Sequence, residues 1–362
     1  MPERLKDMFF TKESVANFVK HISRFYKQFD ASKFYTLVYS PEWEGLELKA
    51  RMRHLTLCLR ETLPADYKKA IKILWSVSEF VKGFEGMVCP DFVEVYGLDD
   101  EETSLPALKR FTEFSSSEFS IRPFLDRDPK GIMKFMLECA VDKHENIRRF
   151  SSEGCRPRLP WAMALPKFKK DPSLILKLLE KLKDDDSLFV RKSVANNLND
   201  ISKDNPDLVL KKCETWIGKS VKTDWIIKQA CRTLLKLGDK RALILFGFSS
   251  PDELHIHDLN ISKTSLKIGE DLQFGFTLHV KDSKGGKVRL EYAVYYMKAN
   301  GKTSKKVFQI TENSYAPGEY TFSKKQTFKE MTTRKHYPGK HELAVIINGE
   351  EKQRVDFLLK KP

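Results

Sequence analysis

The spacing of apolar residues changes once along the chain. Before residue 249 they recur every three or four positions, as in helices; Val190, Val194, Leu198 and Ile201 share one helix face at steps of four, four and three. Prolines and glycines separate further stretches with the same periodicity. Helices are accordingly predicted at 12–29, 47–63 and 67–84.

A pair made of an apolar residue and a basic residue recurs within this helical part. The four copies are separated by 39, 43 and 37 residues, and each is expected to open a helix that follows another helix. A period of this length is typical of HEAT-type helix pairs, which stack into a solenoid. We therefore predict an α-solenoid of HEAT-like repeats over residues 1–250. The four pairs are Leu108-Lys109, Ile147-Arg148, Val190-Arg191 and Ile227-Lys228.

Near Ser249-Ser250-Pro251 the period changes from helical spacing to strict alternation of apolar and polar residues. Six or seven short segments with this alternation follow, separated by Gly-Gly, Asn-Gly and Pro-Gly turns. This pattern predicts a separate all-β domain over residues 251–362, an immunoglobulin-like β-sandwich. Because no cysteine follows Cys231, the sandwich cannot contain the disulfide of secreted relatives.

The net positive charge of the chain indicates which class of binding partner to expect. The chain carries a formal net charge of +14, of which 251–362 contributes +6 (20 basic minus 14 acidic residues) and the helical part +8 (14 − 6). A polyanion is the functional interpretation, and a lysine-rich soluble surface is the alternative. The chain has no apolar run of membrane-spanning length and no signal-peptide core, and its six scattered cysteines form no CxxC motif. We therefore expect a reduced protein of the cytosol.

Three carboxylates fall at related helical angles in successive repeats. Glu118 and Asp200 each lie ten residues after the apolar repeat position, and Glu153 lies six after it, within about 40° on the same helix geometry. They would then line one side of the solenoid; the alternative is that each is a solvated surface acid. Packed helices lie roughly 8–10 Å apart, so Glu118 and Asp200 converge only if the array curves tightly.

A proline-bounded loop follows Glu153. Pro157 and Pro160 should end the helix that begins at Glu145, because proline lacks the N–H that a helix interior requires. The loop then presents Trp161 beside Arg156 and Arg158, and an indole can pack on a sugar or a cationic base.

Several long motifs resemble one enzyme family. They are ELKARMRHLTLCLRETLP (47–64), SLPALKRFTEFSSSEFSIRPFL (104–125), RRFSSEGCRPRLPW (148–161) and VRKSVANNLNDISKDNPD (190–207). The helical part resembles the AlkC branch of the AlkC/AlkD family of bacterial alkylpurine DNA glycosylases, and residues 255–360 fit the subgroup with a C-terminal immunoglobulin-like domain. This resemblance implies hydrolysis of the N-glycosidic bond of cationic N-alkylated bases (3-methyladenine, 3-methylcytosine) in duplex DNA without base flipping. We also predict a monofunctional base-excision-repair enzyme, because no lysine lies in an obviously apolar stretch suited to Schiff-base chemistry. We expect a monomer of the bacterial cytosol, associated with the nucleoid.

The predicted catalytic residues are Glu118, Glu153, Trp161 and Asp200, since fixed carboxylates stabilise developing positive charge at the sugar and orient water. No cofactor and no metal are predicted, because His255 and His257 share a strand face but lack a third ligand. The alternative function is a non-enzymatic HEAT-repeat scaffold that binds nucleic acid or an acidic protein.

The predicted DNA-binding residues fall into two groups. Those in the solenoid are Arg148, Arg156, Arg158 and Lys203, although Arg148 could instead form a structural ion pair. The others lie near two turns of the sandwich, where loops reach a ligand and where lysines also collect for solubility. They are Lys302, Lys305 and Lys306 with Lys298 around Asn300-Gly301, and Lys281, Lys284 and Lys287 around Gly285-Gly286.

Overall fold

The computed structural model describes residues 8–281, 285–330 and 335–361, and Lys284 lies outside them. The chain divides into two compact units, and the boundary between them along the sequence falls between Ala230 and Cys231. The helices of the first unit are α2 (Lys12–Phe25), α3 (Ala31–Val38), α4 (Leu48–Arg60), α5 (Tyr67–Val77), α6 (Val88–Tyr96), α7 (Glu101–Phe114), α8 (Arg122–Arg127), α9 (Pro129–Cys139), α10 (Glu145–Gly154), α11 (Pro166–Lys170), α12 (Ser173–Leu182), α13 (Leu188–Ile201), α14 (Pro206–Trp216) and α15 (Val221–Ala230).

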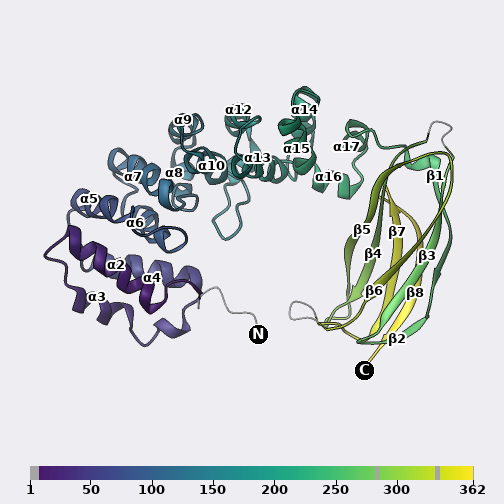
Figure 1. Cartoon of the computed structure of the whole chain (residues 1–362), viewed down its shortest axis with the longest axis horizontal. Coiled ribbons are helices and arrows are strands. Elements are labelled where there is room, and N and C mark those ends of the chain that lie inside the picture. Colours follow the sequence, from purple (N-terminus) through teal and green to yellow (C-terminus); the bar gives the residue numbers. More distant parts are fainter. Residues whose placement is uncertain (1–7, 282–284, 331–334, 362) are drawn as a thin grey trace. The chain divides into compact units, whose positions relative to one another are not determined.

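Within the first unit the helices follow one another along an arc (Figure 1). Helix α9 packs on α10, α12 on α13 and α14 on α15, while α10 lies against α13 and α13 against α15. This arrangement confirms the predicted solenoid of helix pairs. Four residues at the apolar repeat position anchor it in the core, since each is at most 2% exposed: Leu108, Ile147, Val190 and Ile227.

The helix boundaries differ from the predictions in detail. Leu108 and Ile227 lie in the middle of α7 and α15 and do not open these helices. The predicted helix at 12–29 ends at Phe25, and the one at 67–84 ends at Val77. Among the described residues, no helix is long and apolar enough to cross a membrane. All six cysteines are free and buried, as expected for reduced apolar residues.

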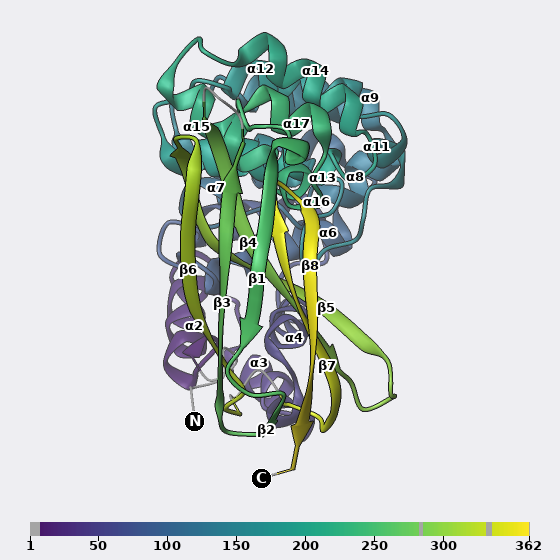
Figure 2. The same cartoon turned by 90° about the vertical axis from the view of Figure 1, so that its right-hand side faces the viewer.

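The second unit contains the predicted sandwich. Its strands are β1 (Leu254–Ile261), β2 (Ser265–Lys267), β3 (Asp271–Val280), β4 (Gly286–Met297), β5 (Thr303–Tyr315), β6 (Gly318–Thr327), β7 (Gly339–Ile347) and β8 (Glu350–Lys360). They form a three-stranded sheet, β1-β3-β6, and a five-stranded sheet, β2-β8-β7-β4-β5. Figure 2 shows β6, β3 and β1 side by side. Alternate residues of both sheets, such as Leu272, Phe274, Leu290 and Val345, fill one shared core.

This unit begins before its first strand. Helices α16 (Arg232–Leu237) and α17 (Lys240–Leu245) belong to it, so it starts 20 residues (251 − 231) before the predicted boundary. Ser249 donates its N–H to the Lys287 carbonyl at 3.0 Å and accepts from Asn348 Nδ2 at 2.8 Å. Gly238 and Gly349 also meet closely at positive φ, and a Cβ on Gly349 would lie 2.0 Å from the Gly238 Cα. Side chains at this contact would therefore force the two segments apart.

The predicted lysine cluster of the sandwich is divided. Lys302 is exposed in the β4–β5 turn, but Lys305 and Lys306 lie in β5, where consecutive side chains point to opposite faces. Lys305 pairs with Glu351 at 2.6 Å, while the Lys306 ammonium lies 5.4 Å from the centre of the Phe308 ring. The sequence predicted that the three lysines lie together at one turn, but in the structure they do not form a single surface there.

The expectation that His255 and His257 lack a third potential metal ligand is wrong. Strands β3 and β6 bring His279 and Glu319 beside His257, so the His255–His257 pair does have further potential metal ligands nearby.

Glu351 generates a testable prediction about stability. Burial raises its pKa, but hydrogen bonds from Lys305, Tyr295 and Arg354 outweigh burial and lower the pKa from 4.5 to about 2. Because the folded-state pKa lies below the unfolded one, the stabilisation is present above about pH 4.5 and is lost as the pH falls towards 2. Glu351→Gln should therefore lower the free energy of unfolding at pH 7 and have little effect near pH 2.

The measurement is urea unfolding across this pH range. Glu350→Gln is a matched control, because the Glu350 carboxylate is half exposed and, within the described residues, forms its ion pair with Lys352 at 3.0 Å. If the free energy of unfolding depended on pH in the same way in both variants, the lowered pKa would not belong to Glu351.

Candidate functional site

The ends of two neighbouring helices position the central carboxylates. Glu153 is the second-last residue of α10, and Asp200 is the second-last residue of α13, which packs directly against α10. Helix α10 ends at Gly154, just before Arg156 and Pro157, as the prolines predicted. Both carboxylates are buried, so each requires a charged or hydrogen-bonding partner.

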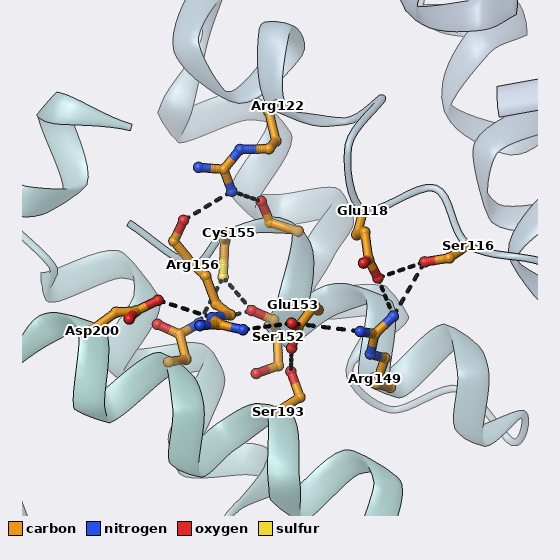
Figure 3. Close-up of polar contacts among 12 residues, drawn as sticks. Ser116, Glu118, Arg122, Arg149, Ser152, Glu153, Cys155, Arg156, Ser193 and Asp200 are labelled. Atoms are coloured by element: carbon orange, nitrogen blue, oxygen red, sulfur yellow. Dashed lines mark hydrogen bonds and ion pairs between the residues drawn. The ribbon is translucent and has the colours of Figure 1, made fainter. Parts of the chain in front are cut away.

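Arg156 lies between these two carboxylates (Figure 3). Its Nη1 donates to Glu153 Oε1 at 2.6 Å, and its Nε donates to Asp200 Oδ2 at 2.9 Å. Burial lowers the pKa of Arg156, but the attraction of Glu153 and Asp200 outweighs burial and raises the pKa above its usual value. The guanidinium therefore joins two helices of successive repeats through charge-assisted hydrogen bonds.

The remaining oxygens of these carboxylates also have partners, which differ in exposure. The Ser193 hydroxyl donates to Glu153 Oε2 at 2.6 Å and is buried. Lys203 Nζ donates to Asp200 Oδ1 at 3.2 Å, but the Lys203 side chain is 40% exposed. Asp200 thus has one oxygen whose partner reaches solvent, whereas both Glu153 oxygens are held by buried groups.

Glu118 reaches the same cluster by a route that helical register did not predict. Helix α7 ends at Phe114, so Glu118 lies in the following connection and not on the helix of Leu108. It forms an ion pair with Arg149 of α10, whose Nη2 is 3.5 Å from Glu153 Oε1. The residues Glu118, Arg149, Glu153, Arg156 and Asp200 therefore alternate in charge, and we call this set the carboxylate–arginine ladder.

Arg122 fixes the backbone behind the ladder, and sequence reasoning missed it. It is fully buried at the start of α8 and donates to the carbonyl oxygens of Gly154 at 2.9 Å, Arg156 at 2.8 Å and Met163 at 2.7 Å. Burial lowers the pKa of Arg122 to about 10. An arginine inside the apolar run SIRPFL was the available signal, because such a cation is rarely buried without a specific role.

Trp161 is presented on the loop that Arg122 holds. Its side chain is 62% exposed, and its backbone has φ of 63°, a conformation that costs a non-glycine residue of order 1–2 kcal/mol. Lys49 of α4 donates to the Trp161 carbonyl at 2.5 Å while its ammonium lies 4.4 Å from the Phe119 ring centre. The surrounding structure thus holds a strained backbone that leaves a large aromatic ring in solvent.

The predicted phosphate-binding arginines and lysine have different surroundings. Arg156 is buried in the ladder, and Arg148 donates to Asp185 at 2.7 and 3.0 Å and to two backbone carbonyls, which is the structural ion pair that was the alternative. Arg158 is exposed and pairs with Asp204 at 2.6 Å. Arg158 and Lys203 are therefore the members of this group that a phosphate could reach.

A groove of about 330 Å³ adjoins the Glu118 end of the ladder. Arg149 contributes to its wall, and its guanidinium lies 4.9 Å from the ring centre of Phe189, an exposed residue of α13. Aromatic walls with a few polar groups suit a planar ligand. The groove is lined by Gly83, Phe84, Met87, Phe114, Ser115, Ser116, Asn146, Arg149 and Phe189.

Comparison with known proteins gives consistent matches over the whole chain. A family model described as the C-terminal Ig-like domain of the uncharacterised protein YhaZ matches residues 255–361. The uncharacterised protein YhaZ of Bacillus subtilis (strain 168) is 46% identical over 354 residues, which are 98% of each chain. The solved structure of Pseudomonas fluorescens alkylpurine DNA glycosylase AlkC, bound to DNA containing an abasic site analog, is 37% identical with a TM-score of 0.92. It aligns over 99% of this chain and 100% of its own. The chain therefore belongs to the AlkC family, in the form that carries a C-terminal immunoglobulin-like domain.

Proposed function

We propose that this protein is a monofunctional DNA glycosylase that hydrolyses the N-glycosidic bond of cationic N-alkylated bases, such as 3-methyladenine and 3-methylcytosine, in duplex DNA. The observation that carries the proposal is the ladder itself, in which Arg156 joins the buried Glu153 and Asp200 and is followed, five residues later in the chain, by the exposed Trp161. The 37% identical AlkC is an alkylpurine DNA glycosylase bound to DNA in its solved structure, which supports the same class of substrate.

The chemistry needs little acid catalysis. A base alkylated at a ring nitrogen is cationic, so when the C1′–N bond breaks its electron pair neutralises the base, which leaves. Positive charge then develops at C1′ as in glycoside hydrolysis, and preorganised carboxylates stabilise that charge. Water adds to C1′ and gives up a proton to a carboxylate, so the products are the free base and an intact strand with an abasic site.

We assign to Asp200 the role of orienting the attacking water and accepting its proton. Both oxygens of Glu153 are engaged by the buried Arg156 and Ser193, whereas Asp200 Oδ1 is bonded to the half-exposed Lys203. A DNA phosphate would compete for the Lys203 ammonium and release this oxygen towards the substrate. Glu153 then acts mainly by charge, and Trp161 packs on the sugar or the cationic base from outside the stack, with a cation–π attraction of about 0.5–2 kcal/mol. This route needs no extrahelical pocket for the base.

The first prediction concerns the two buried carboxylates. Asp200→Asn and Glu153→Gln should each slow excision by at least about 100-fold, because both remove charge that stabilises the transition state. Affinity for duplex DNA should stay within a few-fold. Asp204→Asn is the control, since its carboxylate pairs with Arg158 at the surface.

Release of free 3-methyladenine and 3-methylcytosine at saturating enzyme in a single turnover is the measurement. Rates equal to wild type in both variants would refute the site assignment, and no release of base by the wild type would favour the scaffold function. Strand breakage without added base would contradict the monofunctional reaction.

The second prediction separates the contribution of the Trp161 side chain to excision from its effect on the stability of the protein. Glycine adopts positive φ without strain, so Trp161→Gly should keep the free energy of unfolding within about 1 kcal/mol of wild type while excision falls. Met163→Ala, which truncates another exposed side chain of the same loop, should retain the excision rate within a few-fold. A Trp161→Gly protein with full excision activity would remove the indole from the mechanism.

The third prediction concerns the β4–β5 turn, which we propose as a DNA contact. Lys298 and Lys302 are exposed at this turn, so their replacement by alanine together should flatten the slope of log affinity against log salt by up to about 1.8. The effect should be equal for damaged and undamaged duplex. Lys305→Ala is the control because Lys305 already pairs with Glu351, and identical salt slopes for all three proteins would mean that the turn does not contact DNA.

A further inference from the structure

The outer face of the three-stranded sheet carries a cluster of metal-ligating side chains. In the cross-strand registers, His255 on β1 pairs with His279 on β3, and His279 pairs with Glu319 on β6. His257 lies two residues after His255 and therefore on the same face. The alternating residues Leu254 and Ile256 point the other way, into the sandwich core, so the histidines lie on the side away from the core.

Three of these side chains approach one another at the distance that a shared metal requires. One ligand atom from each of His257, His279 and Glu319 lies within 4.8 Å of the others. His257 Nε2 is 3.4 Å from Glu319 Oε1, and the His257 and His279 ring centres are 5.7 Å apart. Tetrahedral zinc with bonds of about 2.0–2.2 Å places its ligand atoms about 3.4 Å apart. His257 and Glu319 are already at this spacing, and a small rotation of the His279 side chain would bring its ring nitrogen to the same distance.

His257 Nε2 is itself shielded from solvent and forms no hydrogen bond among the described residues, while Glu319 Oε1 lies 3.4 Å away. A metal bound between these two atoms would give each of them a ligand bond. His255 lies on the same face, but its ring centre is 6.5 Å from that of His279, against 5.7 Å for His257. The side chains whose ligand atoms converge are therefore His257, His279 and Glu319.

We propose that His257, His279 and Glu319 form a site for a divalent transition metal, specifically Zn²⁺. Two imidazoles and one carboxylate are the ligand types that zinc accepts, and three protein ligands leave a fourth position for water. The ligands come from β1, β3 and β6, so the metal would link all three strands of this sheet. This link matters because the sequence from 232 to 362 contains no cysteine and hence no disulfide.

The experiment is a zinc titration of tag-free, full-length protein stripped of metal with a chelator, in competition with a chromophoric chelator. We expect one site per chain, and at least about ten-fold weaker binding in His279→Gln and in Glu319→Gln, because each removes a ligand. His255→Gln, on the same face and strand as His257, should bind as wild type does, and Mg²⁺ should not compete because it prefers oxygen ligands. Equal zinc affinity in the wild type and both ligand variants would overturn the proposal.

A second readout guards against a folding defect in the variants. A metal that binds only the folded state must stabilise it by mass action, so saturating Zn²⁺ should raise the urea midpoint of the wild type. The midpoint of Glu319→Gln should match that of the wild type without metal and should not respond to Zn²⁺. A wild-type midpoint that does not change with Zn²⁺ would also overturn the site.

Discussion

The ion pairs of Arg156 are the interaction on which the candidate site depends. One guanidinium forms ion pairs with both Glu153 at the end of α10 and Asp200 at the end of α13. Removing one partner of a buried ion pair leaves an uncompensated charge at a cost of about 3–5 kcal/mol, and in the described part of the chain Arg149 and Lys203 each contact only one of these two carboxylates. The same residue is fixed from behind, because Arg122 binds its carbonyl oxygen. Arg156 thus links the two carboxylates and is itself held in place by Arg122.

The ladder also connects carboxylates from different repeats. Helix packing alone would leave Glu118 and Asp200 too far apart to share one substrate atom. Arg149 and Arg156 lie between the carboxylates and join them through ion pairs, so the acidic groups do not need to meet at one point. Such an array suits a transition state whose positive charge is spread over a sugar and a departing base. The loop that carries Trp161 begins at the same place, immediately after Glu153 and Arg156.

The fold was predictable because both periodicities are strong, and the site was predictable only in part. Val190, Val194, Leu198 and Ile201 are all fully buried, as their spacing required. Register failed for Glu118 because α7 ends four residues earlier, where the chain turns at Ser115. Arg156 was expected at a phosphate because sequence shows that an arginine follows a helix but not which carboxylate of a later repeat will face it. The same limit applies to Lys305, whose partner Glu351 is 46 residues away (351 − 305).

The central claim is that the ladder acts as a unit through Arg156, and a double-mutant cycle on excision tests it most directly. Single-turnover release of 3-methyladenine would be measured for Glu153→Gln, Asp200→Asn and the double variant. Residues that act as a unit are strongly non-additive. The account predicts that the double variant is slower than the slower single variant by no more than a few-fold. A loss equal to the product of the two single losses would show that the carboxylates act independently and would contradict it.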